Sequence, residues 1–381
     1  MAAELVVLGA TGSIGTQTFE VARRLDIPVV AMAARAGSDE LFNLGLTWPD
    51  ARLVVAAATD DERLRFVDAF GKRVSFGPES VQEVAATRGA VVMNGIVGSV
   101  GLAASVAAIE AGNRLGLANK ESLVAGGPVL LAARQRTGAE IIPVDSEHSA
   151  IYQCLKGERA SDVARIVLTA SGGPFLGRSL RQLEAVTPSE ALAHPTWDMG
   201  RRISIDSATL VNKGLEVIEA HFLFDLPFEQ IDVVVHPQSV VHSLVEFLDG
   251  SSKAHLGEPD MRVPIQYAVT YPHRAPGGLA PFQLGGKTLT FLEPDRATFP
   301  ALDLAYEVGN MGGSSPAVFN AADEVAVQAF LEGRLSFLGI VDVIERTVSR
   351  MPTINLDSVA DVLAVDAEAR LVADQLISGA C

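Results

Sequence analysis

Two carboxylates in one short segment of this chain could hold a metal cation. The segment reads PVDSEH at residues 143–148. In an extended chain, residues i and i+2 point to the same side, so Asp145 and Glu147 would present paired carboxylates. Such a pair repels itself unless a cation or a proton intervenes. Oxygen ligands favour Mg²⁺ or Mn²⁺ over Zn²⁺, although His148 leaves a softer metal site open. The alternative is a solvated loop edge, which is the commoner structure for an isolated pair of this spacing.

A third carboxylate occurs in a segment that could also bind phosphate. If residues 209–224 form a helix, Asn212 and Glu216 lie four residues apart on one face. Lys213 then lies beside them, and Ser207 stands at the helix entry. A helix N-terminus, a hydroxyl, an amide and an ammonium together form a cradle for phosphate. The alternative, an ordinary capped helix, explains the serine but not the adjoining Asn-Lys-Gly sequence.

Three loops carry further groups that could contact a ligand. Ser171 opens the sequence SGGP and offers a hydroxyl beside a backbone that can approach a ligand closely. The sequence NKE at 119–121 follows an apolar run, where a parallel sheet binds its ligands; the alternative is a helix start with surface charge. The loop His194–Gly200 carries Trp197 between a Pro and a Gly, so it is either a lid or a loop packed on the core.

The N-terminal sequence LGATGSIG at residues 8–15 could bind a dinucleotide. Glycines three apart permit a tight turn and let backbone N–H groups and a helix N-terminus approach a pyrophosphate. The alternative is a glycine-rich turn without a ligand. After the second expected strand, Arg35 occurs with no carboxylate before Asp39. This order favours the 2′-phosphate of NADP over the free ribose of NAD, unless Arg35 is a solvated loop residue.

These groups must be positioned by strands and helices, and the N-terminal part of the chain alternates the two. Short β-branched runs alternate with stretches of helical periodicity, which indicates a mostly parallel sheet covered by helices on both faces. Ligands of such a sheet bind at the carboxyl ends of its strands. The expected strands are 5–8, 29–32, 53–56, 91–93, 115–118 and 141–144, and the expected helices are 13–25, 102–110 and 122–134.

From about residue 151 the pattern changes. Val-rich runs at 232–236 and 240–247 stand among motif-dense loops, and residues 271–294 have the Pro and Gly content of a linker. Helical periodicity returns at 303–308, 317–332, 339–350 and 357–377. We therefore predict an α/β protein with a Rossmann-like doubly wound sheet at 1–149, a central α+β catalytic domain at 150–275, a linker at 276–297 and a C-terminal helical bundle at 298–381.

Composition excludes several classes of partner. The chain has 381 residues, and its 30 Lys and Arg against 46 Asp and Glu give a formal net charge of −16, which repels nucleic acid and anionic membranes. An anionic substrate then needs a locally positive site. Cys154 and Cys381 lack metal-type spacing and are expected to be a buried small residue and a tail residue of a reduced compartment.

No membrane span or leader is expected either. The uncharged run 90–109 is interrupted by Asn, Ser and Gly, which favours a strand, a turn and a packed helix over a membrane span. The first residues lack the basic region of a signal peptide, so we expect a cytoplasmic protein.

Taken in order, the motifs of this chain resemble those of the 1-deoxy-D-xylulose 5-phosphate reductoisomerase family along nearly its whole length. They are LGATGSIG, NKES, PVDSEH, SGGPF, HPTWDMG, DSATLVNKGLEVIEA, HPQSVVHS and LGEPDM. The ordered set is specific, because unrelated Rossmann proteins share only the first motif. The resemblance implies a homodimer with an NADPH-binding domain, a catalytic domain with a mobile loop, a linker and a helical domain. It also implies NADPH- and Mg²⁺- or Mn²⁺-dependent isomerisation and reduction of 1-deoxy-D-xylulose 5-phosphate to 2-C-methyl-D-erythritol 4-phosphate, in non-mevalonate isoprenoid biosynthesis.

The resemblance also implies roles for individual residues. The cation ligands would be Asp145, Glu147 and Glu216, with Ser146 contacting the substrate beside them. The substrate phosphate would be held by Ser171, Ser207, Asn212 and Lys213. Lys120 would contact the reacting hydroxyl and carbonyl region, and His194 and Trp197 would close over it. The NADPH contacts would be Thr11, Gly12, Ser13, Ile14, Asn119, Glu121 and Gly200, to which the residue pattern adds Arg35.

Two positions depart from the family pattern, and two other functions remain open. At Arg35, Ala36 and Gly37, many members have Gly, then Lys or Ser, then Asn. At Asp323, the usual residue is Asn. The first departure leaves the 2′-phosphate contacts open. Another NADP-dependent Rossmann dehydrogenase, acting on a small acid or semialdehyde, would need neither a metal nor a phosphate cradle. A non-catalytic NADP-binding or scaffold protein would not need three carboxylates around a lid.

Overall fold

The structure is a computed structural model that describes residues 4–197 and 199–379. Contacts within the chain group it into two compact units, each described by itself. The first unit comprises residues 1–122, 129–146 and 260–279, and the second comprises 123–128, 147–259 and 280–381. The predicted four-part division, with a linker at 276–297, stays a prediction.

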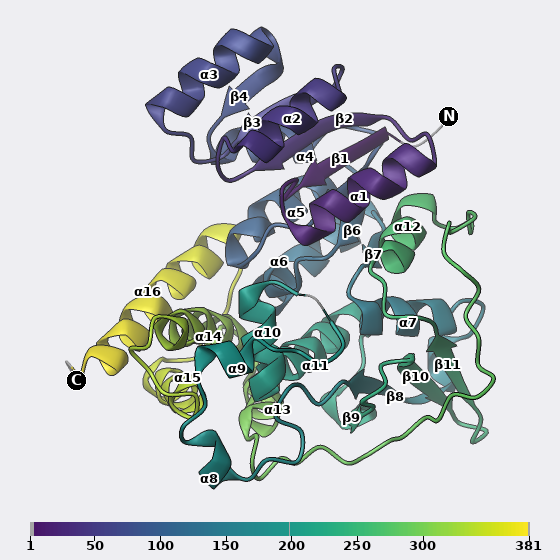
Figure 1. The fold of residues 1–381 in the computed structure, drawn as a ribbon, viewed down its shortest axis with the longest axis vertical. Coiled ribbons are helices and arrows are strands. Elements are labelled where there is room, and N and C mark those ends of the chain that lie inside the picture. The colour runs from purple at the N-terminus through teal and green to yellow at the C-terminus, as the bar shows by residue number, and fades with distance from the viewer. Residues whose placement is uncertain (1–3, 198, 380–381) are drawn as a thin grey trace. The chain divides into compact units, whose positions relative to one another are not determined.

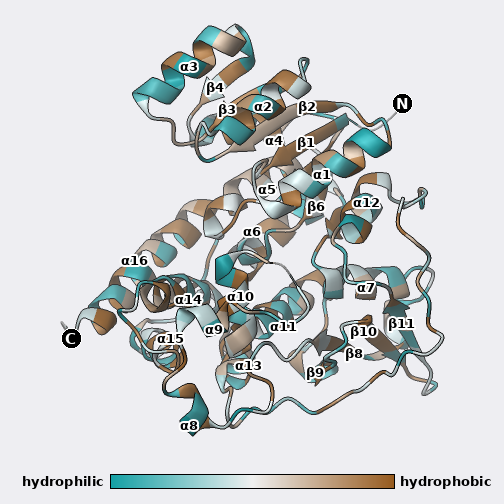
Figure 2. Cartoon of the chain, viewed as in Figure 1, coloured by the Kyte–Doolittle hydropathy of each residue, from teal (hydrophilic) through white to brown (hydrophobic). Residues whose placement is uncertain are grey.

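The first unit is built on a parallel sheet of seven strands in the order β4-β3-β2-β1-β5-β6-β7. Its central strands β1 and β5 are apolar except for Glu4 at the start of β1 and Asn94 at the end of β5, as expected for strands with both faces covered (Figure 2). The strands are β1 (Glu4–Leu8), β2 (Val29–Ala34), β3 (Arg52–Val55), β4 (Val74–Phe76), β5 (Ala90–Asn94), β6 (Arg114–Leu117) and β7 (Ile141–Pro143).

Helices cover both faces of this sheet. Helix α1 packs with α12, and α4 packs with α5, which places the two pairs on opposite faces as right-handed crossovers require when the strand order reverses at β1 (Figure 1). The helices joining or covering these strands are α1 (Ser13–Arg24), α2 (Asp39–Thr47), α3 (Asp60–Phe70), α4 (Pro78–Ala85), α5 (Leu102–Glu110), α6 (Lys120–Thr137) and α12 (Arg262–Thr270).

The second unit contains a four-stranded sheet in the order β11-β10-β8-β9. Strands β8 and β9 are parallel, while β10 is antiparallel to both β8 and β11. The strands are β8 (Val163–Ala170), β9 (Ile231–Val235), β10 (Val241–Phe247) and β11 (Ser252–Leu256). The edge strand β11 is largely exposed and carries Lys253, a residue type that discourages further strand pairing.

Helices make up the rest of the second unit. In α15 the buried residues recur at the spacing of one helix face, and this face packs on α14, which also contacts α16. Helix α11 packs on α13, where Gly214 allows close approach: a Cβ there would lie 2.6 Å from the Ala305 Cβ. The helices are α7 (Ser146–Cys154), α8 (Leu180–Leu183), α9 (Pro188–Ala191), α10 (Arg201–Thr209), α11 (Val211–Phe224), α13 (Ala301–Met311), α14 (Ser315–Leu331), α15 (Gly339–Arg350) and α16 (Val359–Ser378).

The predicted fold class is confirmed, with differences in detail. Every strand and helix named from the sequence is present within a few residues of its expected bounds. The elements that were not predicted are β4, β11, α2, α3, α4, α7, α8, α9, α10 and α12. Cys154 is buried as expected, while Cys381 lies outside the described residues. Within residues 4–197 and 199–379, none of the helices combines the length and apolarity needed to cross a lipid bilayer.

Candidate active site

Three carboxylates meet at the start of helix α7. Carboxylate oxygens of Asp145, Glu147 and Glu216 lie within 4.8 Å of one another. The predicted geometry of the first pair is wrong, because α7 begins at Ser146 and places Glu147 in a first helical turn rather than in an extended chain. A carboxylate in that turn is favoured by the helix dipole. The all-oxygen donor set fits a hard divalent cation such as Mg²⁺ or Mn²⁺.

Two lysines balance these carboxylates. The Lys213 ammonium lies 3.2 Å from Glu147 Oε1, contacts Glu216 Oε2, and donates to the Thr169 carbonyl at 2.6 Å. The Lys120 ammonium lies 2.6 Å from Asp145 Oδ2, and the two side chains are only 10% and 9% exposed. Carboxylates this buried are retained as charges only beside cations, so the site is built to hold positive charge.

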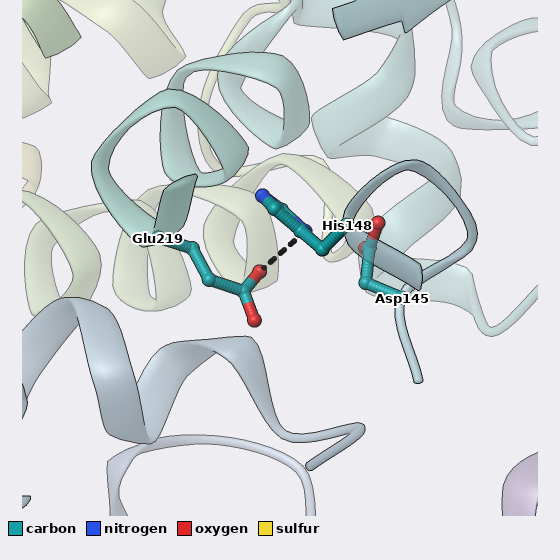
Figure 3. A group of neighbouring side chains, drawn as sticks. All are labelled: Asp145, His148 and Glu219. Carbon is teal, nitrogen blue, oxygen red and sulfur yellow. Dashed lines mark ion pairs between the residues drawn. The ribbon is translucent and has the colours of Figure 1, made fainter. Parts of the chain in front are cut away.

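A second group of possible metal ligands consists of Asp145, His148 and Glu219 (Figure 3). Figure 3 shows His148 and Glu219 facing each other, with 3.2 Å between Nδ1 and Oε2, and neither side chain is exposed. His148 Nε2 lies 2.9 Å from the Glu216 carbonyl oxygen, which can only accept, so Nε2 carries the proton. His148 therefore ties α7 to α11 through the hydrogen bond of Nε2, and its Nδ1 forms an ion pair with Glu219 only when the ring is protonated. The softer metal site that the sequence left open stays open.

The expected phosphate residues gather where β8 ends. Ser171 follows β8, and a Cβ on Gly173 would lie 2.8 Å from the Ser207 carbonyl, so this turn packs on the end of α10. Lys213 reaches the same place by its bond to Thr169. Ser207 does not stand at a helix entry as predicted. It lies in the last turn of α10, and the left-handed Leu210 (φ 62°) separates α10 from α11.

Asn212 and Glu216 do share a face of α11, as their spacing predicted. The Asn212 amide donates to Glu216 Oε1 at 2.5 Å, one turn along the helix. The side chain of Lys213 is only 4% exposed. The cation and phosphate candidates are therefore neighbours on one helix turn, and they share hydrogen bonds.

His194 joins the loop His194–Gly200 to the phosphate candidates. Its Nε2 lies 2.9 Å from the Ser171 hydroxyl, and its Nδ1 accepts the N–H groups of Thr196 and Trp197 at 3.2 and 2.9 Å. An accepting Nδ1 fixes the tautomer with the proton on Nε2. Burial lowers the pKa of His194 below its ordinary value of 6.5, so the ring is neutral at neutral pH.

A pocket of about 350 Å³ is formed by this loop and the residues that flank it in the sequence. Trp197 is half-buried and its ring lies 6.4 Å from that of His242. Asp198, within the same loop, lies outside the described residues. The lid function of the loop stays a prediction. The pocket is lined by Leu192, Ala193, His194, Pro195, Thr196, Trp197, Met199 and Ser204.

The glycine-rich turn after β1 is shaped by close packing. Gly9 has φ +79°, and a Cβ there would lie 2.4 Å from the Gly95 carbonyl oxygen; a Cβ on Gly15 would lie 2.4 Å from the Gly9 oxygen. Gly12 precedes α1 with φ −83° and is exposed. The N-terminus of α1, with Thr11 and Ser13 beside it, is thus presented at the carboxyl edge of the sheet, where a pyrophosphate would bind. Ile14 occupies the first turn of α1.

The other predicted NADPH residues differ in accessibility. Arg35 is exposed at the end of β2, and Gly200 is exposed at the start of α10. Asn119 is only 1% exposed. Its amide donates to the Gly98 carbonyl at 2.9 Å and its oxygen accepts the Ser122 N–H, so this side chain orders the loop after β5. Its direct contact with NADPH, like that of Glu121, stays a prediction.

Sequence reasoning missed an ionic network behind the loop His194–Gly200. Arg202, in the first turn of α10, pairs with Asp323 and Glu324 of α14 at 3.0 and 2.9 Å. Arg370 of α16 pairs with the same Glu324. The one local signal is Asp206, four residues after Arg202 on the same helix, at 3.5 Å.

Comparison with known proteins places the chain in one family. A family model for 1-deoxy-D-xylulose 5-phosphate reductoisomerase matches residues 5–127, and models of its C-terminal domains match 141–224 and 256–372. Proteins of that name from Ralstonia nicotianae and Kitasatospora griseola are each 48% identical, over 99% and 98% of this chain and 98% and 100% of their own.

Solved structures agree. The Zymomonas mobilis reductoisomerase in complex with NADPH superimposes with a TM-score of 0.91 at 40% identity, covering 99% of each chain. A DOX-P reductoisomerase in complex with NADPH, fosmidomycin and magnesium also gives 0.91, at 37% identity, covering 99% of this chain and 98% of that one.

Proposed function

Because the chain belongs to the 1-deoxy-D-xylulose 5-phosphate reductoisomerase family, we propose that it isomerises and reduces 1-deoxy-D-xylulose 5-phosphate to 2-C-methyl-D-erythritol 4-phosphate. It uses NADPH and a divalent cation, Mg²⁺ or Mn²⁺, and serves non-mevalonate isoprenoid biosynthesis. The observation that carries this proposal is the carboxylate trio Asp145, Glu147 and Glu216, with Lys213 pairing with two of its members beside the phosphate candidates. Another NADP-dependent dehydrogenase of a small acid would need no such trio.

The phosphate group of the substrate is bound by Ser171, Ser207, Asn212 and Lys213. The Ser171 oxygen already accepts from His194 Nε2 and from the Gly173 N–H at 3.2 Å, so its own proton is directed to a further acceptor. A phosphate oxygen suits that proton and the Lys213 ammonium. Binding energy from this remote group orients the reacting carbons.

The reacting carbons lie beside the carboxylates. Asp145, Glu147 and Glu216 hold the cation, which when bound supplies Lewis-acid polarisation of neighbouring substrate oxygens. Ser146 contacts the substrate at the first turn of α7, and Lys120 donates to its hydroxyl and carbonyl region. His194 and Trp197 exclude water when the loop closes over the site.

NADPH binds at the carboxyl edge of the parallel sheet. Its pyrophosphate takes backbone N–H groups of the turn that includes Thr11, Gly12, Ser13 and Ile14. Arg35 faces the 2′-phosphate, and Asn119, Glu121 and Gly200 complete the contacts. The protein acts as a cytoplasmic homodimer, which size-exclusion chromatography with light scattering would test.

One assay tests the function. Purified protein should oxidise NADPH with 1-deoxy-D-xylulose 5-phosphate in the presence of Mg²⁺ or Mn²⁺, and chelation should stop the reaction. Glu216→Gln removes one ligand charge, so it should weaken Mn²⁺ binding and abolish turnover while NADPH binding is retained. Glu246→Gln alters a partly exposed carboxylate of β10 that pairs with Arg165; it is the matched control and should remain active. Full activity of Glu216→Gln in chelator would refute the assignment.

A further inference from the structure

The ammonium of Lys213 occupies a position that two ligands would contest. It contacts Oε1 of Glu147 and Oε2 of Glu216, two oxygens that would coordinate the proposed cation. The same ammonium is a proposed phosphate partner. One group cannot satisfy both demands fully, because an ammonium has three protons and one is already given to the Thr169 carbonyl.

The surroundings hold this ammonium in place. The Lys213 side chain is 4% exposed and that of Glu216 is 2% exposed. Water therefore cannot solvate either charge well if the two groups separate. The other oxygen of Glu216 accepts from Asn212, which fixes the carboxylate and points its remaining oxygen at Lys213. Removing the ammonium from the carboxylates therefore requires another cation to take its place.

We propose that Lys213 is exchanged between the two sites: it pairs with Glu147 and Glu216 until a divalent cation binds them, and it then turns to the substrate phosphate. This inference rests on the proposed function of the site. Its consequence is cooperative binding, since the cation frees the ammonium that the phosphate needs. The phosphate turn lies within reach, because Thr169, which holds the ammonium, stands two residues before Ser171.

Linkage makes the proposal quantitative. If the cation strengthens phosphate binding by some factor, phosphate must strengthen cation binding by the same factor. Separating an ammonium from a buried carboxylate costs a charge-assisted hydrogen bond, which corresponds to roughly ten- to a hundredfold in affinity. Lys213 should therefore weaken cation binding while it strengthens phosphate binding, although it is no cation ligand.

The experiment measures binding alone. Mn²⁺ affinity is determined by electron paramagnetic resonance, with and without methyl phosphate, for the unaltered protein, Lys213→Met and Lys253→Met. Lys253 is about half exposed and pairs with Glu158, so its substitution matches the loss of charge without touching the site. We expect methyl phosphate to strengthen Mn²⁺ binding to the unaltered protein about fivefold or more. We expect Lys213→Met to bind Mn²⁺ roughly tenfold more tightly without methyl phosphate and to lose most of the coupling.

Several outcomes would overturn the exchange. It is wrong if methyl phosphate leaves Mn²⁺ affinity of the unaltered protein unchanged, a test that needs no variant. It is also wrong if Lys213→Met binds Mn²⁺ no more tightly than the unaltered protein. It is wrong if Lys213→Met retains the full coupling between Mn²⁺ and methyl phosphate, because simple attraction between the bound ions would produce that result. Finally, it is wrong if Lys253→Met changes Mn²⁺ binding in the same way as Lys213→Met. None of these readouts requires turnover. If the reductoisomerase assay failed while these binding results were obtained, the proposed substrate would be wrong but the exchange of Lys213 would still hold.

Discussion

Arg202→Met should destabilise the second unit far more than an equally well-paired surface arginine would. Arg202 makes three charge-assisted hydrogen bonds at 2.9–3.0 Å, to Asn320, Asp323 and Glu324. Its side chain is 15% exposed and that of Asp323 is 0% exposed. The bonds join the first turn of α10 to α14, so the helix that carries Ser207 is held from one side.

The expected loss is about 3–5 kcal/mol, the range for breaking a buried ion pair by removing one partner. Summing about 1.5–3 kcal/mol for each of the three bonds would overestimate the loss, because the contacts share one guanidinium and water can enter beside it. The control is Arg165→Met. Arg165 pairs with Asp232 and Glu246 at 2.6 and 2.7 Å, but its side chain is 46% exposed, so about 1 kcal/mol or less is expected.

The assay is urea unfolding followed by Trp197 fluorescence. Trp48 is the other of the two tryptophans, so Trp48→Phe serves as the parent for both variants. Trp197 then reports on the second unit, which contains both arginines. Equal urea midpoints for Arg202→Met and the parent, or an equal loss in Arg165→Met, would refute the argument that burial decides the worth of these pairs.

The same network predicts a pH dependence. Burial acts to raise the pKa of Glu324, but the guanidiniums of Arg202 and Arg370 outweigh it and hold the pKa below the ordinary value of 4.5. A carboxylate with a lowered folded pKa stabilises the protein above its ordinary pKa, and this contribution is lost as pH falls through the folded value. The stability gap between Arg202→Met and its parent should therefore narrow below about pH 4.5.

Other predictions concern the histidine beside the loop, the glycine turn and the loop itself. Burial, aided by repulsion from a neighbouring histidine, lowers the pKa of His242 to about 4, so stability should fall as pH drops from 6.5 toward 4, by up to about 3 kcal/mol. His242→Asn should flatten that slope in urea midpoints measured across the range. Gly9→Ala should lower the thermal midpoint sharply, because the added Cβ would lie 2.4 Å from a backbone oxygen. In Gly12→Ala the nearest atom to the added Cβ is 3.4 Å away, so this variant should fold normally and only weaken NADPH binding. Trp197→Ala should lower kcat/KM with little change in the thermal midpoint. The loop is no lid if the kinetics of this variant are unchanged and if the loop is cleaved equally by a protease with and without a phosphonate substrate mimic, metal and NADPH.

The regular parts of the fold could be predicted because their signals are local. Helix α15 was predicted at 339–350, its observed bounds, since its apolar residues recur at helical spacing between a Gly and a polar end. Strand β11 was missed because it is a short, largely exposed edge strand, and its sequence SKAHL contains no β-branched residue. The break at Leu210 gave no signal, since leucine rarely adopts a positive φ and only the packing around α10 and α11 selects it.

The candidate site also has parts that the sequence could predict and parts that it could not. Asp145, Glu147 and Glu216 could be grouped as candidate metal ligands because carboxylates are typical ligands of hard cations, and the structure brings the three together, although Glu147 lies in a helix rather than in an extended chain. The bonds of Arg202 to α14 could not be predicted, because they join residues more than a hundred positions apart and nothing in the local sequence specifies the pairing. Contacts of this kind come from packing rather than from periodicity.

His148 explains how two of the proposed cation ligands, Glu147 and Glu216, are held at a fixed spacing although its ring contacts neither of their carboxylates. Glu147 and His148 are neighbours on α7, while Glu216 and Glu219 lie one turn apart on α11. His148 binds the Glu216 backbone through one nitrogen and faces the Glu219 carboxylate with the other. Any slide of α7 along α11 would therefore break the buried hydrogen bond from His148 Nε2 to the Glu216 carbonyl, at a cost of about 1–3 kcal/mol. Because metal ligands must be held to within a fraction of an ångström, a buried histidine behind the two candidate ligands fixes their spacing while leaving their carboxylate oxygens available to the proposed cation and to Lys213.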